Sequence, residues 1–425
     1  MSKLIIEGGR RLNGEISVHG AKNSALPILA ATLLGTTESV LHNCPDLSDV
    51  DASIKILSHL GCKCKREGKS LVIDSRNVEN YYIPDALMRE MRSSIVFLGA
   101  IVARLGRARL SFPGGCELGP RPIDLHLKAL KELGLVIEED HGYLDCKVNG
   151  RLKGSKIILA FPSVGATENV MIAAATAEGT TIITNAAREP EISDLADFLN
   201  GCGAKISGAG EGIIKIEGVE KLTGTEHKVI ADRITAASYM AAAAVTGGTL
   251  IVKDIVPAHL DPIIPIFEEA GCEILIKSNE IKIKAPNRLK RINSIRTMPY
   301  PGFPTDAQAP IMSMTTVADG TSFFTETIFE SRYKHVGELL RLGANIKVEG
   351  KVAVVEGVKK LHGAKVEATD LRGAAALVIA GLAADGTTEM TGLFHLDRGY
   401  ENIEENFTEI GANIKRERER QTAIF

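Results

Sequence analysis

A glycine-rich loop carries Cys116, the residue best suited to chemistry. The loop reads SFPGGCELGPRPIDLH, and its glycines and prolines exclude both a helix and a central strand, so we expect an exposed and mobile thiol. A free thiol has a pKa of about 8.5, which a nearby arginine such as Arg121 lowers. Cys116 could therefore act as a general acid or a nucleophile near neutral pH. A structural cysteine is the alternative, but the Gly-Gly-Cys context followed by Arg121 favours reactivity.

The other cysteines have the pattern of packing residues. Seven cysteines are scattered over 425 residues without a pair of CxxC motifs, so neither a disulfide framework nor a zinc site is predicted. Cys62, Cys202 and Cys272 each adjoin a glycine that ends an amphipathic run, where packing is the expected role. We expect no metal site and no cofactor.

Charged side chains elsewhere could complete a site. Asp306, in GFPTDAQAP, follows a Gly/Pro segment and opens an apolar helix, so it is the best carboxylate for a base, although an N-cap role suits the same position. His126 and His395 flank charged segments, where we expect hydrogen-bonding scaffold roles. The cations suited to phosphates and a carboxylate are Lys22, Arg92, Arg121, Arg332, Arg372 and Arg398. For any one of these cations alone, a helix cap or a surface ion pair is the alternative.

Composition limits the range of partners. Fifty Lys plus Arg against 53 Asp plus Glu give a formal charge of −3, which leaves no basic excess for a nucleic acid. The start, MSKLIIEGG, has no apolar segment of the kind that directs secretion, and the apolar stretches fall short of the roughly 20 residues that span a bilayer. We therefore expect a cytoplasmic protein without nucleic-acid partners or membrane insertion. The sequence carries no signal for an oligomeric state.

Two glycine landmarks recur along the whole chain at intervals of 66 to 73 residues. One ends amphipathic runs, at Gly61, Gly134, Gly203, Gly271, Gly343 and Gly411. The other precedes runs that are mostly β-branched, at Gly35, Gly106, Gly179, Gly248, Gly320 and Gly386. Such regularity predicts six copies of one structural unit.

Each unit contains one helix that is apolar nearly all round and one that is amphipathic. The first must be buried and the second must lie at the surface, so the unit reads as βαβαββ. Six units in 425 residues divide into two domains of three. We predict an N-terminal domain over residues 22–229, which carries the Cys116 loop, and a C-terminal domain over residues 1–21 and 230–425.

The starts of the apolar helices are polar in most units. The residues there are Lys22 and Asn23, Arg92, Ser163 to Gly165, Asp232 and Arg233, Asp306, and Asp370 with Arg372. A helix N-terminus carries roughly half a positive charge and unpaired N–H groups. Three such ends per domain, directed at a shared cleft, predict an anion-binding site.

These segments together resemble the enolpyruvyl transferase family, and within it the branch that acts on UDP-N-acetylglucosamine. The resemblance rests on SFPGGCELGPRPIDLH, AKNSALP at Lys22, MRSSI at Arg92, SVGATEN at Ser163, FPTDAQAP at Asp306 and HLDRGYENI at Arg398. The motifs occur in the family's order from end to end of the chain. The resemblance implies a two-domain inside-out α/β barrel built from six βαβαββ repeats, in which the N-terminal strand joins the C-terminal domain.

The resemblance also implies a reaction. The enolpyruvyl group of phosphoenolpyruvate would pass to the 3-hydroxyl of UDP-N-acetylglucosamine by addition and elimination, with release of phosphate, in the first committed step of peptidoglycan synthesis. Cys116 would protonate the methylene carbon, and it can hold phosphoenolpyruvate covalently, while Asp306 would take the hydroxyl proton. Family members with this cysteine are alkylated by fosfomycin, so sensitivity is expected.

Further site residues follow from the resemblance alone. The implied catalytic residues are Cys116, Asp306, Lys22 and Arg398. Phosphoenolpyruvate would be held by Lys22, Arg121 and Arg398, with Asn23 beside them and Arg332 and Arg372 as further cations. The sugar nucleotide would be held by Arg92, Arg121, Pro122, Ile123, Asp124, Leu125, Ser163, Val164, Gly165, Asp306 and Ile328. Some members carry a lysine just before Ser163, where this chain has Ala160, Phe161 and Pro162.

Two other functions fit parts of the pattern. The sister enzyme 3-phosphoshikimate 1-carboxyvinyltransferase shares the fold and the phosphoenolpyruvate chemistry but lacks the Gly-Gly-Cys loop. A non-catalytic UDP-sugar sensor would share the binding residues, but the presence of Cys116, Asp306 and Lys22 disfavours it.

Overall fold

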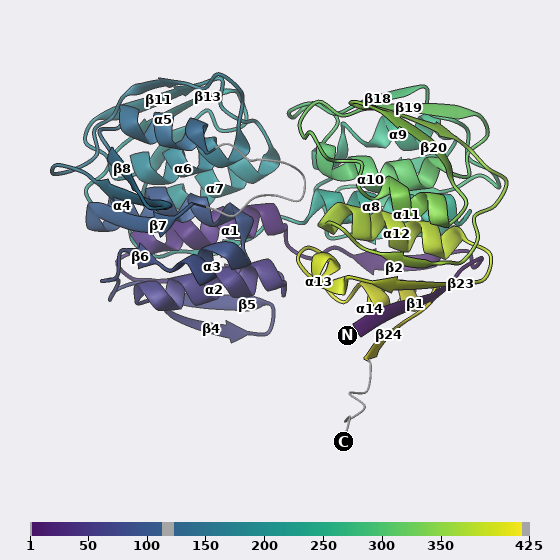
Figure 1. Cartoon of the computed structure of the whole chain (residues 1–425). Coiled ribbons are helices and arrows are strands. Elements are labelled where there is room, and N and C mark those ends of the chain that lie inside the picture. The colour runs from purple at the N-terminus through teal and green to yellow at the C-terminus, as the bar shows by residue number, and fades with distance from the viewer. Residues whose placement is uncertain (1, 113–122, 419–425) are drawn as a thin grey trace. The chain divides into compact units, whose positions relative to one another are not determined.

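The computed structural model describes residues 2–112 and 123–418, which belong to two compact units. We call residues 20–112 and 123–230 the N-terminal unit and residues 2–19 and 231–418 the C-terminal unit. In Figure 1 the N-terminal unit runs from purple to teal, and the C-terminal unit is mostly green and yellow. No helix among the described residues is long and apolar enough to cross a membrane.

Each unit holds three four-stranded sheets outside a set of buried helices. The third sheet of the N-terminal unit shows the common pattern, with the order β10-β11-β13-β12. Its first two strands are parallel and its last two are antiparallel, as the predicted βαβαββ unit requires. The described residues form six such sheets, which confirms the six predicted copies.

The first sheet of the N-terminal unit includes β14, the strand at the C-terminal end of this unit, which pairs in parallel with β3. Its first repeat consists of β14 (Glu226–Lys228), α1 (Lys22–Ala31), η1 (Thr32–Leu34), β3 (Glu38–His42), α2 (Ser48–Leu60), β4 (Lys63–Glu67) and β5 (Ser70–Asp74). The second consists of β6 (Tyr82–Ile83), α3 (Asp85–Glu90), η2 (Arg92–Val96), α4 (Phe97–Leu105), β7 (Arg107–Ser111), α5 (Asp124–Glu132), β8 (Val136–Asp140) and β9 (Tyr143–Lys147). The third consists of β10 (Lys156–Ile158), α6 (Val164–Ala174), β11 (Thr180–Thr184), α7 (Pro190–Gly201), β12 (Lys205–Ser207) and β13 (Ile213–Glu217).

The C-terminal unit takes two strands from the start of the chain. Its first repeat consists of β2 (Asn13–Ser17), α8 (Arg233–Val245), β15 (Thr249–Lys253), η3 (Pro257–Leu260), α9 (Ile264–Glu269), β16 (Glu273–Ile276) and β17 (Glu280–Lys284). The second consists of β18 (Ser294–Arg296), α10 (Thr305–Thr315), β19 (Thr321–Thr325), α11 (Val336–Arg341), β20 (Asn345–Glu349) and β21 (Val352–Glu356). The third consists of β22 (Lys365–Glu367), α12 (Leu371–Ala383), β23 (Thr387–Thr391), α13 (Leu393–Leu396), α14 (Ile403–Glu409), β24 (Asn413–Arg418) and β1 (Ser2–Glu7).

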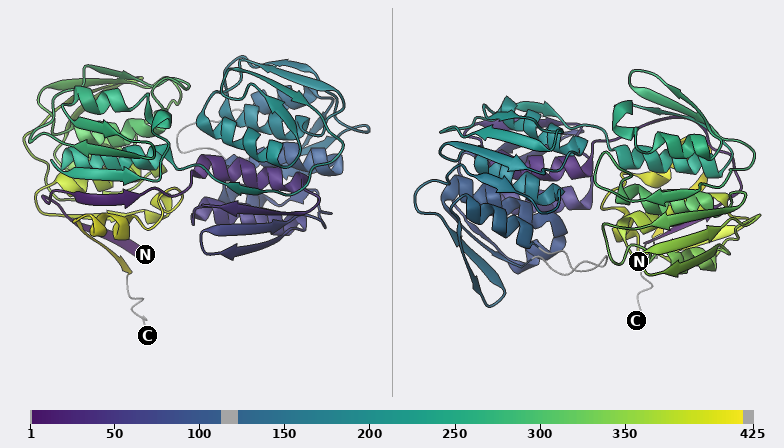
Figure 2. Two further views of the ribbon diagram at one scale, coloured as in Figure 1. Left: turned by 180° about the vertical axis from the view of Figure 1, so that it is seen from behind. Right: turned by 90° about the horizontal axis from the view of Figure 1, so that it is seen from above.

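The N-terminal strands close this unit. β1 lies between β23 and β24 and is antiparallel to both, so it takes the place of the fourth strand of the third repeat. β2 pairs in parallel with β15 and is therefore the first strand of the first sheet. Both strands lie among the elements of the C-terminal unit in Figure 1 and in the two views of Figure 2.

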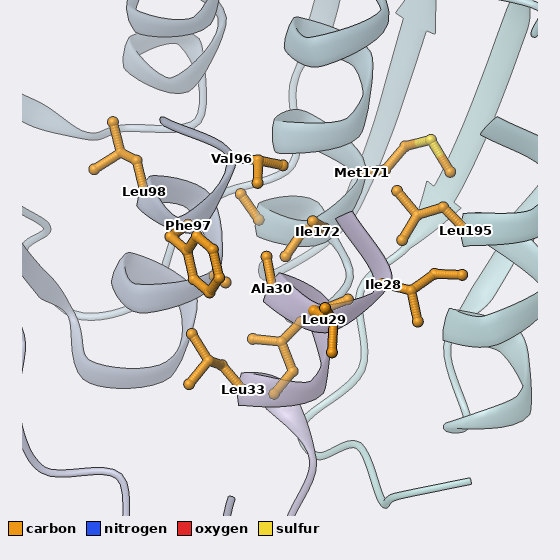
Figure 3. Close-up of a cluster of buried hydrophobic side chains, with 14 of the residues drawn as sticks. Ile28, Leu29, Ala30, Leu33, Val96, Phe97, Leu98, Met171, Ile172 and Leu195 are labelled. Atoms are coloured by element: carbon orange, nitrogen blue, oxygen red, sulfur yellow. The ribbon is translucent and has the colours of Figure 1, made fainter. Parts of the chain in front are cut away.

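The helices inside each unit are buried because their sequences lack a polar face. α1, α4 and α6 pack on one another in the N-terminal unit, as α8, α10 and α12 do in the C-terminal unit. Figure 3 shows Ala30 of α1 between Phe97 of α4 and Ile172 of α6, and Ile28 of α1 beside Leu195 of α7. Each such side chain stabilises the fold by roughly 1.5–3 kcal/mol through the apolar surface it removes from water.

The glycines that end the amphipathic runs have the conformation that their spacing predicts. Gly61 closes α2 with φ of 109°, the left-handed region in which a side chain is strained. A Cβ at this position would also lie 2.5 Å from the Asn77 carbonyl oxygen. The other five glycines of this set share the positive φ: Gly134, Gly203, Gly271, Gly343 and Gly411. Because each marks the end of a helix, their spacing reports the length of the repeat.

Candidate active site

Asp306 lies in the first turn of α10, where two arginines bind its carboxylate. The N-cap of this helix is Pro304, and no side chain caps it, so the alternative role of Asp306 as the N-cap is wrong. Arg332 Nη2 lies 2.9 Å from Asp306 Oδ1, and Arg372 Nη2 lies 3.0 Å from Asp306 Oδ2. Each carboxylate oxygen therefore accepts a charge-assisted hydrogen bond from a different guanidinium.

The exposure of these three side chains is uneven. The side chains of Arg332 and Arg372 are 3% and 2% exposed, whereas that of Asp306 is 27% exposed. Arg332 is also fixed by a 3.1 Å bond from Nη2 to the Thr305 carbonyl oxygen. The carboxylate is thus the accessible end of an otherwise covered cluster, and its position is set by the two guanidiniums. Such a group can accept a proton from a bound ligand without first having to be oriented.

A buried polar network continues inward from Arg372. Arg372 Nη1 donates to the Tyr400 hydroxyl at 3.3 Å, and that hydroxyl lies 2.8 Å from Ser238 Oγ on α8. Burial works against the charge on Arg372, but the Asp306 carboxylate and Tyr400 raise its pKa above the ordinary value. Burial raises the pKa of Tyr400 as well. Through this network α8, α10 and α12 are joined close to their N-terminal ends.

Glu326 fixes the segment that carries Ile328. This carboxylate is 1% exposed, and its Oε1 accepts bonds from Ile328 N at 2.8 Å and Phe329 N at 3.0 Å. Its Oε2 accepts a 3.0 Å bond from the Thr305 hydroxyl beside Asp306. Glu326 was not among the residues predicted from the sequence. The signal available in the sequence was an acidic residue directly after a strand-like run, two residues before Ile328.

Arg398 belongs to the C-terminal unit with Asp306. It follows α13 and is half-buried. Its neighbour Asp397 accepts bonds of 2.9 and 2.7 Å from Arg416 on β24, which also lies 2.6 Å from Glu404. The turn that carries Arg398 is therefore attached to a sheet strand by its adjacent residue.

Lys22 is the first residue of α1 and lies in the N-terminal unit. Its Nζ is 3.2 Å from Asp49 Oδ2 in the first turn of α2, and the two side chains are 11% and 3% exposed. Asp49 was not among the predicted residues, because nothing local in the sequence links positions 22 and 49. The adjacent Asn23 is half-buried. The Asp49 carboxylate thus holds the Lys22 ammonium at the start of α1.

The starts of α5 and α6 lie together in the N-terminal unit. Ser163 is the N-cap of α6 and accepts a 3.4 Å bond from Ala166 N. A Cβ on Gly165 would lie 2.9 Å from Cε1 of His126 on α5, so these two helix starts are in close contact. Ile123 and Leu125 are half-buried and Asp124 is exposed. The polar start of α6 thus lies next to the segment before His126.

The predicted site residues are divided between the two units. Those described in the N-terminal unit are Lys22, Asn23, Ile123, Asp124, Leu125, Ser163, Val164 and Gly165. Those in the C-terminal unit are Asp306, Ile328, Arg332, Arg372 and Arg398. Cys116, Arg121 and Pro122 lie outside the described residues, and of Arg92 only its place at the start of η2 is described.

The described part of the chain contains no group of three or more His, Cys, Asp or Glu side chains that could hold a metal ion. The ion-pair partners of Asp306 in the candidate site are two arginines.

Comparison with known proteins identifies the family. The model of EPSP synthase (3-phosphoshikimate 1-carboxyvinyltransferase) matches residues 6–407. UDP-N-acetylglucosamine 1-carboxyvinyltransferase 2 of Caldanaerobacter subterraneus subsp. tengcongensis is 56% identical over 416 residues, which cover 98% of this chain and 100% of that protein. The UDP-N-acetylglucosamine 1-carboxyvinyltransferase of Geotalea uraniireducens is 49% identical over 419 residues, which cover 99% of this chain and 100% of that protein. The chain belongs to the UDP-N-acetylglucosamine 1-carboxyvinyltransferase branch of the enolpyruvyl transferase family.

Solved structures of enolpyruvyl transferases confirm the predicted fold class. NikO from Streptomyces tendae matches with a TM-score of 0.89 at 25% identity over 98% of both chains. EPSP synthase from Acinetobacter baumannii matches with a TM-score of 0.76 at 18% identity over 98% of this chain and 100% of that one. The sequence is much less similar to this EPSP synthase than to the relatives named for UDP-N-acetylglucosamine, which disfavours the sister enzyme.

Proposed function

We propose that this protein transfers the enolpyruvyl group of phosphoenolpyruvate to the 3-hydroxyl of UDP-N-acetylglucosamine, with release of phosphate, in the cytoplasmic part of peptidoglycan synthesis. The observation that carries the proposal is the Asp306 carboxylate held between Arg332 and Arg372 at the start of α10. The resemblance assigns the hydroxyl proton to this position. High identity over nearly the full length of the relatives supports the same substrate pair.

In the addition step, Asp306 accepts the proton of the sugar 3-hydroxyl while the oxygen of that hydroxyl forms a bond to C2 of phosphoenolpyruvate. Cys116 delivers a proton to C3, which gives the tetrahedral intermediate. Arg332 and Arg372 hold the carboxylate in place and offset the charge of the substrates. In the elimination step the Cys116 thiolate takes a proton back from C3, and the electron pair of that C–H bond forms the C2–C3 double bond. The C2–O bond to phosphate breaks, and phosphate leaves with the electrons of that bond and takes up the proton held by Asp306.

Binding must bring two anionic substrates together. Lys22, Arg121 and Arg398 hold phosphoenolpyruvate in this proposal. Asp49 orients the buried Lys22 side chain and provides the counter-charge that an ammonium with little solvent needs. The N–H groups at the start of α1, which no side chain caps, add to the attraction for phosphate oxygens.

Phosphate release with defined substrates tests the reaction. We expect release when phosphoenolpyruvate and UDP-N-acetylglucosamine are both present, and none when either is left out. Release with shikimate 3-phosphate in place of the sugar nucleotide would select the sister enzyme. Absence of release with both acceptors would favour the sensor.

Intact mass after fosfomycin treatment tests the thiol separately. The six described cysteines are buried or half-buried, and burial raises the pKa of Cys64, Cys146, Cys202 and Cys272 to about 12. Because thiols react as thiolates, these side chains should be inert. We expect one adduct on the wild-type protein and none on Cys116→Ala. An adduct that persists in Cys116→Ala would place the reactive thiol elsewhere.

A further inference from the structure

A fully buried amide joins three segments of the N-terminal unit. Asn169 lies on α6, is 0% exposed, and is surrounded by apolar helix. Its Nδ2 donates to the Ile95 carbonyl oxygen of η2 at 2.9 Å, and its Oδ1 accepts a 2.7 Å bond from Gly99 N on α4. Nδ2 also lies 3.1 Å from Nδ1 of His126 on α5. One side chain therefore binds groups from η2, α4 and α5.

These bonds fix the orientation of the amide and the tautomer of the histidine. A backbone N–H only donates, so the atom facing Gly99 is Oδ1, and the atom facing the Ile95 carbonyl is Nδ2. The second N–H of Nδ2 then points at His126 Nδ1, which must offer a lone pair. The proton of a neutral His126 ring is therefore on Nε2. Burial lowers the pKa of His126 to about 4, which keeps the ring in this neutral form.

Two glycines make the close approach possible. A Cβ on Gly99 would lie 2.4 Å from Asn169 Oδ1 and 2.5 Å from the Asn169 carbonyl oxygen, so a side chain there would separate α4 from α6. A Cβ on Gly165 would be 3.2 Å from His126 Nε2. The chain of contacts thus runs from Gly99 through the amide and the imidazole to the first turn of α6.

The joined segments are those that the family resemblance assigns to the sugar nucleotide. η2 begins at Arg92, residues 123–125 lie just before His126, and residues 163–165 form the start of α6. We propose that Asn169 is a positioning residue for UDP-N-acetylglucosamine, which holds these three segments in register without touching the ligand. This inference rests on the proposed function. It deepens that function by separating sugar-nucleotide binding from the chemistry at Asp306.

A purely structural amide would have a different signature. It would stabilise the unit, and its loss would lower the unfolding temperature without selecting one substrate. A positioning role predicts a change in affinity for UDP-N-acetylglucosamine that is larger than the change in affinity for phosphoenolpyruvate, with a small change in kcat.

Asn169→Asp is the sharpest variant, because it keeps the shape and the acceptor for Gly99 N but removes both N–H donors. We expect Kd and KM for UDP-N-acetylglucosamine to rise about tenfold, as for loss of a buried hydrogen bond, with kcat and the KM for phosphoenolpyruvate within about threefold. The new carboxyl faces Nδ1 of His126, so the histidine ring should titrate at higher pH by NMR. Kd is measured by calorimetry, which does not depend on turnover.

Asn200→Asp is the matched control. Asn200 lies on α7 in the same unit, donates to the Ile206 carbonyl oxygen at 2.9 Å and accepts from Ile206 N at 2.8 Å. Its substitution also removes a donor to the backbone, but at the C-terminal end of a helix. We expect a lower unfolding temperature with unchanged Kd and KM.

A second pair of variants keeps the test decisive if Asn169→Asp does not fold. His126→Asn retains a side chain that can accept near the position of Nδ1, whereas His126→Leu does not, so the rise in Kd should be smaller for the former. Unchanged Kd in folded Asn169→Asp, or equal Kd in the two His126 variants, would overturn the positioning role. If the wild type neither binds nor turns over UDP-N-acetylglucosamine, the proposed function fails, and this inference fails with it.

Discussion

The two units share one arrangement of strands and helices but differ at the starts of their buried helices. In the C-terminal unit, Asp232 and Asp370 are the N-caps of α8 and α12, and each accepts two backbone N–H bonds. Asp306 occupies the first turn of α10. In the N-terminal unit, α1 begins with Lys22 and α6 is capped by the neutral Ser163, and neither first turn holds an acidic residue.

This difference shows how one fold can divide two tasks. A carboxylate at a helix N-terminus is stabilised by the helix dipole and attracts arginines, and the result in the C-terminal unit is a fixed proton acceptor. Without carboxylates, the helix starts of the N-terminal unit keep their partial positive charge for a ligand's phosphates. We infer that the C-terminal unit supplies the base and that the N-terminal unit supplies most of the anion binding.

The largest effect is expected from removing the base. Asp306→Asn keeps the shape of the side chain but cannot accept the hydroxyl proton, so kcat should fall by about 10²–10⁴, the usual range for a general base. Steady-state phosphate release measures it, and circular dichroism checks the fold. Asp385→Asn is the control, since this exposed carboxylate pairs with Lys360 at 2.7 Å away from the helix starts. If Asp306→Asn retained a tenth or more of the wild-type kcat, the inference that the C-terminal unit supplies the base would be wrong.

The next effect concerns Glu168, the acidic residue on the buried helices α1, α4 and α6. It is 7% exposed, and burial together with Glu191 and Glu189 raises its pKa from 4.5 to about 8. The folded protein therefore holds a proton that the unfolded chain releases above pH 4.5, so stability falls as pH rises from 4.5 to about 8. A neutral Glu168 is what the comparison of the units requires, because an anion there would oppose the helix starts.

Glu168→Gln should remove this pH-dependent loss. We expect the variant to be more stable than wild type by roughly 1–3 kcal/mol at pH 8 and equal to it near pH 4.5, measured by urea unfolding. The control is Glu178→Gln, for which no such difference between the two pH values is expected. Equal stability of Glu168→Gln and wild type at pH 8 would mean that Glu168 is ionised in the folded protein.

The fold could be read from the sequence because its strongest constraint is local. Gly61 and its five counterparts mark helix ends that only glycine fits without strain, so their spacing gives the repeat and its length. Apolar helices without a polar face predicted burial in the same way. Local propensity does not fix helix boundaries, however. The apolar run over residues 93–105, for example, is divided between η2 and α4 and is not one continuous helix.

The contacts of the candidate site could not be read in this way, since they join residues far apart in the chain. Lys22 meets Asp49 across 27 positions, and Asn169 meets Ile95 across 74. The resemblance supplied residue types at the site, but not the pairing of Asp306 with both Arg332 and Arg372. At α10, Pro304 takes the cap position, which leaves Asp306 free of that role and bound to arginines instead.

A smaller effect, a loss of folding stability at acid pH, is expected in both units. Burial lowers the pKa of His126 in the N-terminal unit and of His335 in the C-terminal unit from 6.5 to about 4. The unfolded chain binds these protons below pH 6.5 and the folded protein only near pH 4, so stability falls as pH falls through this window. His126→Asn should reduce the loss by about half, roughly 1–2 kcal/mol between pH 6.5 and 4.5. Chemical unfolding at the two pH values measures it, and an undiminished loss would assign the acid sensitivity to other groups.

The smallest effect sharpens the contrast between Lys22 and Arg398. Lys22 is held directly by the buried Asp49, whereas the turn that carries Arg398 is attached to β24 through Asp397, which Arg416 binds. The side chains of Arg416, Asp397 and Glu404 are 24%, 39% and 19% exposed, so solvent weakens this network, and its loss should cost about 1 kcal/mol or less of stability.

Arg416→Gln should therefore raise KM for phosphoenolpyruvate only about two- to fivefold with little change in kcat, because a looser turn leaves Arg398 less well placed. Lys284→Gln removes a comparable exposed pair, 3.0 Å from Glu273, and should leave KM unchanged. An equal KM in the two variants would show that Arg398 is held by its own contacts and not by its neighbour's.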